Sequence, residues 1–361
     1  MIQSPSFISK PLKQQYNNPL HDDCLIAIYE YKASNTFYFE AIQIWFSERY
    51  KVITYAKLDD NPPYNHNVCG PCDGLYYLWS EHVLGNDRGL WNPALNEYKA
   101  LPLIDTEKLN TPYNLALYNW DSCGFGFDPV TQDYKVVLIK FFTFDGDLVL
   151  SLPPCVLVYS LRTNSWKYVM DLPKFYNLFN NGSDVIVNTS LYWLASEDQN
   201  TDNAEVIIVF DLATNKCRDI QLPEHRTKIT IQRNDGCDYE CLMVYHGDIA
   251  YVTVDDVNNC FDVWALKAGC WAKKLTMGLV VEVQEPLGQW RDGLLVFQGQ
   301  SGTTLILCNL DTQQTWVLTG LPLDSDRRCG FVCPYQESLV SLHDVTTWIY
   351  KQDKCNLLYT S

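Results

Sequence analysis

The chain has 361 residues, of which 47% are hydrophobic and 14% aromatic, and its formal net charge is −16. Such a chain can bury a sizeable core as one large all-β domain, and its Tyr and Trp content favours strands over helices. The strong negative charge argues against nucleic acids and anionic membranes as partners, because phosphate groups repel it. It is compatible with a basic protein partner, or with solubility alone.

The N-terminal residues MIQSPSFISKPLKQQYNNPL contain neither the apolar core nor the cleavage site of a signal peptide. The sequence also lacks an apolar run of about 18 residues, the length that a membrane-spanning helix needs. Its 14 cysteines are therefore expected to be mostly buried, reduced thiols. These features predict a cytoplasmic protein without a membrane partner.

A hairpin pattern recurs along the chain: an apolar strand, a polar turn and a second strand that often ends in Leu-Pro. The copies lie at residues 89–102, 156–173, 206–223, 260–277 and 304–322, and a weaker sixth copy lies at 346–360. Turn pairs such as Thr-Asn and Ala-Gly bond to their own backbone or tolerate positive φ, which suits a hairpin. Proline ends the second strand because it cannot continue the hydrogen-bond ladder.

A further strand signal precedes most of these hairpins, at residues 72–79, 187–195, 245–254 and 290–298. The repeating unit is therefore four strands. Matched leucines at 161, 212, 266 and 310 lie 51, 54 and 44 residues apart, which is the blade length of kelch-like and WD-repeat propellers. The sequence predicts an all-β, kelch-like β-propeller; six blades fit the length best, and seven remain an alternative.

Other architectures fit less well. No amphipathic helix of 12 or more residues is evident, so the crossovers of an α/β fold are missing. No Pro/Gly/Ser linker divides the chain into two β-sandwich domains. We expect residues 37–58 and the C-terminal copy to share the closing blade, since closure through both termini protects the edges of the ring.

Residues 66–79 read HNVCGPCDGLYYLW, and Cys69-Gly70-Pro71-Cys72 has the spelling of a thioredoxin-type redox motif. That motif needs a helix at its first cysteine, because the helix dipole lowers the pKa of the thiol. Here Asp73-Gly74 predicts a turn, and β-forming residues follow. We therefore interpret the two cysteines as flanking a turn, and redox activity is the less favoured alternative.

Three close cysteine pairs, Cys69/Cys72, Cys237/Cys241 and Cys329/Cys333, raise the alternative of a four-thiolate zinc site. The pairs fall in different repeat units and lack ribbon-like spacing, so we favour buried thiols. The histidines are scattered, and no G-x-S-x-G, H-E-x-x-H, P-loop or Rossmann motif is present. We predict no catalytic residue, metal or cofactor. An enzyme on this scaffold would need carboxylates or metal ligands that converge at the central channel.

Acidic residues concentrate in the stretches between strands. They are Glu197, Asp198, Asp202, Glu205, Asp255, Asp256, Asp324 and Asp326. The loops between propeller strands gather on the two faces of the ring, where a basic protein can dock. We predict these eight residues as partner-binding; ordinary polarity of surface loops is the alternative explanation.

Several segments together resemble plant F-box proteins that carry an F-box-associated domain. NVCGPCDGLYYL (67–78) resembles their G-P-C-D-G-L segment, and LWNPALNEYKALP (90–102) resembles their N-P-A-T-R…L-P segment. CGFGFDPVTQDYKVVLI (123–139) resembles G-F-G-F-D…N-D-Y-K-V-V, the hallmark of that domain, and segments 209–223 and 286–311 are similar to its later blades. In this comparison Cys69 is a local variation, which weakens the redox interpretation further.

Within that group the chain looks most like the S-locus F-box proteins. The resemblance implies the substrate-recognition subunit of a Skp–cullin–F-box ubiquitin ligase, with a Skp-type adaptor and a cullin as partners. It also implies a basic S-RNase as substrate, recognised in pollen during self-incompatibility. Catalysis of ubiquitin transfer would then belong to the other subunits of the ligase.

The family's F-box helices end near an I-Q-S-P-S-F-I stretch, and this sequence begins there, with Ile2, Phe7 and Ile8. The resemblance therefore implies that residues 1–20 are a remnant of the F-box and a linker, and that residues 21–361 are the recognition propeller. On this resemblance the sequence is either a fragment or has a misassigned start, or the protein has lost its coupling to the ligase. A chain without the helices would bind its target uncoupled from the ligase, as a decoy. This decoy and a propeller-scaffold enzyme are the alternatives to a ligase subunit.

Overall fold

The structure is a computed structural model. It describes residues 24–33, 36–46, 52–57, 67–79, 88–104, 118–142, 152–178, 185–197, 204–226, 240–255, 258, 260–278, 283–291, 293–299, 304–318, 321, 327–335 and 337–343. Within these ranges every regular element is a β-strand. Accordingly, no helix in the described part of the chain is able to cross a membrane.

The strands form six separate antiparallel sheets, which we number as blades 1 to 6. Blade 1 contains β25 (Arg327–Pro334), β1 (Cys24–Ala33), β2 (Thr36–Phe46) and β3 (Val52–Lys57). Blade 2 contains β4 (Asn67–Cys72), β5 (Leu75–Trp79), β6 (Arg88–Asn92) and β7 (Glu97–Ala100). Blade 3 contains β8 (Tyr118–Asp128), β9 (Asp133–Phe142), β10 (Leu152–Ser160) and β11 (Ser165–Asp171).

Blade 4 contains β12 (Asn177–Leu178), β13 (Val185–Val187), β14 (Ser190–Ser196), β15 (Val206–Asp211) and β16 (Lys216–Gln221), and its innermost strand is divided into β12 and β13. Blade 5 contains β17 (Glu240–Tyr245), β18 (Asp248–Asp255), β19 (Cys260–Lys267) and β20 (Cys270–Gly278). Blade 6 contains β21 (Val283–Arg291), β22 (Leu294–Gly299), β23 (Leu305–Asn309) and β24 (Gln314–Leu318).

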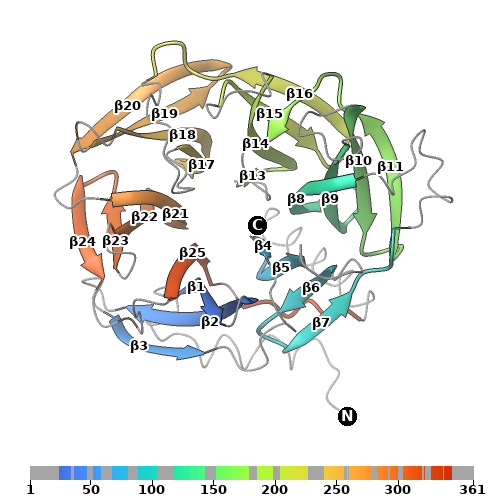
Figure 1. Cartoon of the computed structure of the whole chain (residues 1–361), viewed down its shortest axis with the longest axis horizontal. Helices are drawn as coiled ribbons and strands as arrows, with labels where there is room; N and C mark the ends of the chain where they lie inside the picture. Colours follow the sequence, from blue (N-terminus) through green and yellow to red (C-terminus); the bar gives the residue numbers. More distant parts are fainter. Residues whose placement is uncertain are drawn as a thin grey trace, which may run out of the picture.

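The six sheets stand around a central axis, with the first strand of each blade innermost (Figure 1). The predicted six-bladed propeller is confirmed. Blade 1 closes the ring by combining strands from both ends of the described chain, and Leu25 pairs with Pro334 there. The closing C-terminal strand is β25; the predicted sixth copy at 346–360 lies outside the described residues.

The five strong hairpin copies are the two outer strands of blades 2 to 6. Their turns use the chemistry that the sequence indicated: Asn96, Asn164 and Asn215 have positive φ, and so does the pair Ala268-Gly269. Of the four matched leucines, 161, 212 and 310 follow the third strand of their blade and are buried. Leu266 instead lies inside β19, because that hairpin closes with a two-residue turn.

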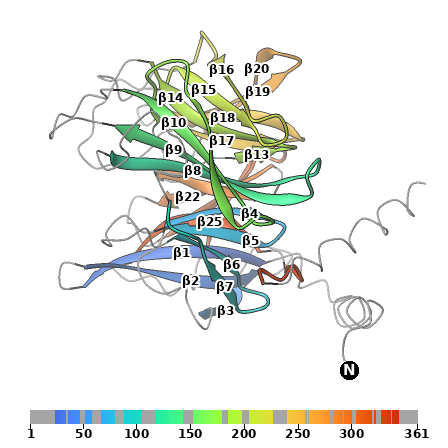
Figure 2. The ribbon, with the colours of Figure 1, turned by 90° about the vertical axis from the view of Figure 1, so that its right-hand side faces the viewer.

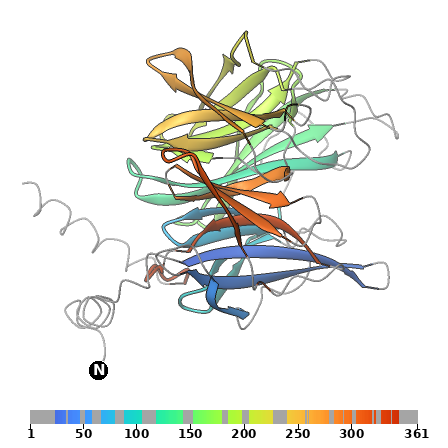
Figure 3. The same ribbon diagram turned by 90° about the vertical axis from the view of Figure 1, so that its left-hand side faces the viewer.

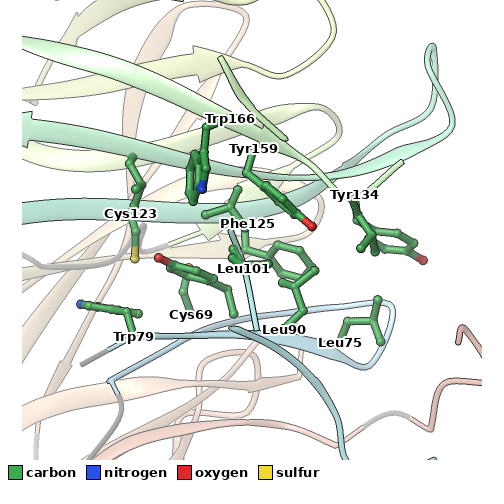
Figure 4. Close-up of a cluster of buried hydrophobic side chains, with 14 of the residues drawn as sticks. Cys69, Leu75, Trp79, Leu90, Leu101, Cys123, Phe125, Tyr134, Tyr159 and Trp166 are labelled. Carbon is green, nitrogen blue, oxygen red and sulfur yellow. The ribbon is translucent and has the colours of Figure 1, made fainter. Parts of the chain in front are cut away.

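The hydrophobic core consists of six clusters, and each fills the seam between two neighbouring blades. Successive residues of a strand point to opposite faces of its sheet, so a middle strand serves two seams. In β9, Val136 and Leu138 face blade 2, whereas Val137 and Ile139 face blade 4. Figure 4 shows the seam between blades 2 and 3, where Cys69 and Leu90 meet Cys123 and Phe125. Strands buried on both faces explain the long apolar runs in the sequence.

Antiparallel pairing gives the ring two different faces, which Figures 2 and 3 view edge-on. On one face, the turn face, strands 1 and 2 and strands 3 and 4 of a blade are joined. On the other, the connector face, strand 2 leads to strand 3, and strand 4 leads to the next blade. The start of β1 lies on the turn face, where the carbonyl of Cys24 accepts hydrogen bonds from the indole of Trp290 (3.2 Å) and the amide of Tyr335 (3.3 Å).

Candidate functional site

Acidic residues are distributed unevenly between the sequence segments that join strand ends on the two faces. The segments that join strand ends on the connector face are 34–35, 58–66, 80–87, 101–117, 143–151, 172–176, 197–205, 222–239, 256–259, 279–282, 300–304 and 319–326, and their sequences contain 19 Asp and Glu against 5 Lys and Arg. The segments on the turn face are 47–51, 73–74, 93–96, 129–132, 161–164, 188–189, 212–215, 246–247, 268–269, 292–293 and 310–313, with 4 acidic and 3 basic residues. The excess negative charge therefore belongs to the sequence segments between those strand ends, of whose acidic residues the structure describes Glu197, Glu205 and Glu224.

Glu197, one of the predicted residues, follows β14 on this face and is exposed. Its Oε1 lies 2.6 Å from the ammonium of Lys174, which also lies 3.2 Å from Oδ2 of Asp219. These two hydrogen bonds raise the pKa of Lys174, so its positive charge persists between the two carboxylates. The hydroxyl of Tyr176 donates to the same Asp219 oxygen at 3.4 Å. Lys174 therefore neutralises part of the acidic surface of blade 4.

Glu205, also predicted, precedes β15 and accepts a hydrogen bond from the buried hydroxyl of Ser196 at 3.0 Å. Because Ser196 ends β14, this bond joins the two ends of the connector between β14 and β15. The backbone amide of Glu205 donates to the carbonyl of Ala195 at 2.9 Å, which extends the pairing of the two strands. Glu205 is thus exposed but held at a fixed position.

The same connector is attached to blade 5 through Ala204. The amide of Ala204 donates to Glu240 Oε2 at 3.0 Å, and its carbonyl accepts from Arg226 at 2.7 Å. Tyr251 donates to the other oxygen of Glu240. Burial raises the pKa of Glu240, although the bonds from Tyr251 and Ala204 and the charge of Arg226 act in the opposite direction. A buried carboxylate therefore fixes the end of an acidic connector.

Asp255, the third predicted residue within the described part, ends β18. Its two oxygens accept from the amide of Asn258 at 3.0 Å and from the Asn258 side chain at 2.7 Å. The Asp255 side chain thus replaces a backbone acceptor for an amide three residues further along the chain. Glu197, Glu205 and Asp255 therefore lie on one face, in corresponding connectors of adjacent blades.

The remaining predicted residues lie outside the described part of the chain: Asp198, Asp202, Asp256, Asp324, Asp326, Ile2, Phe7 and Ile8. The boundary predicted at residue 20 also lies there and stays a prediction. Sequence reasoning missed Lys174, Arg226 and Glu240. Glu240 carried a usable signal, because this acidic residue directly precedes the apolar run CLMVY.

The prediction that Cys69 and Cys72 flank a turn is wrong: both lie in β4, before the turn, and the pairing with β5 is irregular between them. The Gly70–Pro71 peptide is cis. The predicted turn at Asp73-Gly74 is confirmed, with φ of 51° and 74°. Cys69 is buried against Cys123, and burial raises the pKa of the Cys123 thiol. A strand gives Cys69 no helix dipole, so this geometry does not activate a thiolate.

Seven of the twelve described cysteines are buried, and none of the twelve forms a disulfide. In the proposed zinc pairs, Cys69 and Cys72 belong to blade 2, Cys329 and Cys333 to blade 1 and Cys241 to blade 5, whereas Cys237 is not described. Among the described residues, no three His, Cys, Asp or Glu side chains come close enough to share a metal ion.

The six blades around one axis define the chain as a six-bladed β-propeller. More specifically, the chain belongs to the F-box associated beta propeller domain family, which matches residues 24–317.

Similar proteins include two from Arabidopsis thaliana. The F-box protein CPR1 is 26% identical over 273 residues, which cover 68% of this chain and 62% of CPR1. The F-box protein At4g22390 is 29% identical over 213 residues, which cover 55% of this chain and 48% of that protein. The chain therefore spans about half to three fifths of these relatives. TolB from Acinetobacter baumannii aligns with 90% of this chain and 70% of its own, at 9% identity and a TM-score of 0.48, which is too low to support a conclusion.

Proposed function

We propose that this chain is the substrate-recognition part of a Skp–cullin–F-box ubiquitin ligase, and that its connector face binds a basic protein. The family membership and the F-box proteins among its relatives support the ligase role. The observation that carries the choice of face is the excess of 19 acidic over 5 basic residues in the connectors. A face of one charge sign steers a partner of opposite sign and selects against partners of its own sign.

The resemblance to S-locus F-box proteins makes a basic secreted ribonuclease the preferred target. On this proposal the chain performs no catalysis and acts in the cytoplasm, where it sets the choice of target. The eight acidic residues predicted from the sequence would contribute to docking. The fixed positions of Glu205 and Asp255 support a preformed surface, which costs less conformational entropy on binding.

The ligase role is tested by a pull-down with a purified Skp-type adaptor. One sample contains the chain as written, and the other contains the chain extended by the F-box helices of the family. Capture by either form supports coupling to the ligase; capture only by the extended form assigns that coupling to the added helices. Capture by neither form contradicts the ligase proposal and leaves the decoy.

The docking face is tested separately, by binding to a basic ribonuclease at about 50 and about 200 mM salt. Glu197→Gln with Glu205→Gln should weaken binding, and the effect should shrink at the higher salt. Each single variant, Glu197→Gln and Glu205→Gln, is compared with Asp311→Asn in a turn of blade 6, which removes one charge from the opposite face. Equal losses in these single variants and in Asp311→Asn would place docking elsewhere.

A further inference from the structure

The segment that follows β25 runs along the turn face of the ring, against blade 2. Residues 337–343 lead from blade 1 past the β6–β7 turn of blade 2, and Val340 and Leu342 join the hydrophobic cluster between blades 2 and 3. These two side chains are 5% and 0% exposed, whereas Leu339 between them is 44% exposed. Alternate residues thus point into and away from the protein, as in an extended peptide.

Asn92, the last residue of β6, uses its whole side-chain amide at this place. Its Nδ2 donates to the carbonyls of Ser338 (3.1 Å) and Val340 (2.9 Å). Its Oδ1 accepts from the amides of Ala94 (3.0 Å) and Leu95 (3.3 Å) and so caps the turn. Asn92 is fully buried. Removing the segment would leave both donors of a buried amide without these acceptors, which is unfavourable.

Glu97 faces Asn92 across the same turn, as its partner in the β6–β7 register. One oxygen of Glu97 accepts from the hydroxyl of Ser341 at 3.1 Å, and the other accepts from the amide of Leu342 at 2.7 Å. The two ends of one hairpin turn therefore bind four groups of the segment.

Side chains of blade 2 and the seam between blades 2 and 3 hold residues 337–343 in the way that a protein holds a separate peptide ligand. Residues 337–343 belong to no strand, so strand pairing does not hold them in place. Their described contacts are two polar side chains that bind backbone groups and a hydroxyl, and a seam that buries two apolar side chains. The side chains of Asn92 and Glu97 thus hold the extended backbone, and the seam accepts its alternate apolar side chains.

We infer that the β6–β7 turn and the adjoining seam between blades 2 and 3 form a binding site for a short extended peptide with the pattern apolar–hydroxyl–apolar. Val340, Ser341 and Leu342 occupy this site in cis.

The inference is tested on the full chain, with a protease recognition sequence in place of Gln336 and with cleavage after folding. A labelled synthetic peptide of residues 337–343 should then bind the cut protein, and it should bind the uncut protein at least about tenfold more weakly, because the site is filled. A peptide with Leu342→Asp should lose at least about tenfold in affinity, since Leu342 is buried. Leu339→Asp is the matched control and should bind within about twofold of the original. Equal binding of the Leu342→Asp peptide, or equal binding by cut and uncut protein, would overturn the inference.

A second measurement needs no cleavage. Asn309 caps the corresponding turn of blade 6, through the amides of Asp311 and Thr312, so Asn309→Ala removes a similar cap. Hydrogen exchange of the Leu342 amide should accelerate at least about tenfold in Asn92→Ala and stay unchanged in Asn309→Ala. An unchanged rate in Asn92→Ala would refute the site, whatever the outcome of the peptide experiment.

Discussion

The side-chain amide of Gln289 in β21 pairs with the backbone of Val244 in β17. Its Oε1 accepts from the Val244 amide at 2.9 Å, and its Nε2 donates to the Val244 carbonyl at 2.6 Å. The same Nε2 donates to the carbonyl of Arg291 at 2.9 Å. The Gln289 side chain thus makes the pair of hydrogen bonds that a neighbouring strand would make to Val244. These bonds connect the innermost strands of blades 5 and 6.

Replacing Gln289 with Leu should therefore destabilise the protein by about 1–3 kcal/mol, because the amide and carbonyl of Val244 would lose their partners. The measurement is urea unfolding followed by tryptophan fluorescence. Gln314→Leu, at an exposed position of β24, is the control and should change the stability by less than about 0.5 kcal/mol. Equal effects of the two substitutions would show that this pairing contributes nothing measurable.

A side chain at Gly126 should fit only if the side chains of Ile186 and Leu212 shift. A Cβ at this position would lie 2.2 Å from Cδ1 of Ile186 and 2.8 Å from Cδ1 of Leu212, both across the seam in blade 4. Gly126→Ala should destabilise the protein by about 1–3 kcal/mol through overpacking. Gly278→Ala is the matched control, since a Cβ there meets nothing within 4 Å. Thermal unfolding of both variants tests the prediction, and it is wrong if both melt at the wild-type temperature.

Glu240 should make stability depend on pH in mildly acidic solution. Burial raises its folded-state pKa above the ordinary value of 4.5, so the folded protein binds the proton more tightly than the unfolded chain does. The contribution of this group to stability is therefore greatest below pH 4.5 and is lost as the pH rises through the folded pKa.

Unfolding free energies measured in urea at a series of pH values from 4 upward, about half a unit apart, would show the effect. Glu240→Gln should remove this part of the pH dependence. Glu224→Gln, an exposed change near the start of the next connector, should preserve it. A pH profile of Glu240→Gln that matches the wild type would contradict the assignment.

Lys174 should weaken the attraction between the connector face and a basic partner, because it lies between Glu197 and Asp219. Lys174→Met exposes both carboxylates, so association with a basic protein should become roughly two- to fivefold faster at low salt. Stopped-flow association rates at increasing ionic strength measure this. Lys274→Met, on the exposed outer strand β20, removes the same charge elsewhere and should have a smaller effect. If both variants gave the same gain, the proposed face would have no special role.

Local sequence signals predicted most of the fold. Hairpin turns need particular residue types, as at Asp73-Gly74, so the turn between β4 and β5 could be predicted from the local sequence alone. The closing strand could not be found in this way. β25 has no hairpin partner beside it in the sequence, and its partner β1 lies near the other end of the chain. The pair Cys329/Cys333 was considered for zinc, yet both residues are buried parts of that strand.

The charge of the candidate site could be predicted from the sequence, but the contacts that fix the positions of its residues could not. Acidic residues between strands are visible in a sequence, and alternation of strand direction then assigns the connectors to one face. The contact of Glu240 with Ala204 and Tyr251 was hidden, because it joins two blades and depends on packing. The constraint on Gly126 was hidden for the same reason: the atoms that exclude a side chain come from blade 4.

If the chain is the proposed ligase subunit, the hydrogen bonds to the carbonyl of Cys24 bear on the geometry of the assembly. Because Trp290 and Tyr335 both donate to this carbonyl, the point where the polypeptide enters the ring is clamped on the turn face. A domain joined directly before this point would be attached on the side opposite the acidic connectors. The propeller would then act as a spacer of fixed thickness, with the attached machinery on one side and the captured protein on the other.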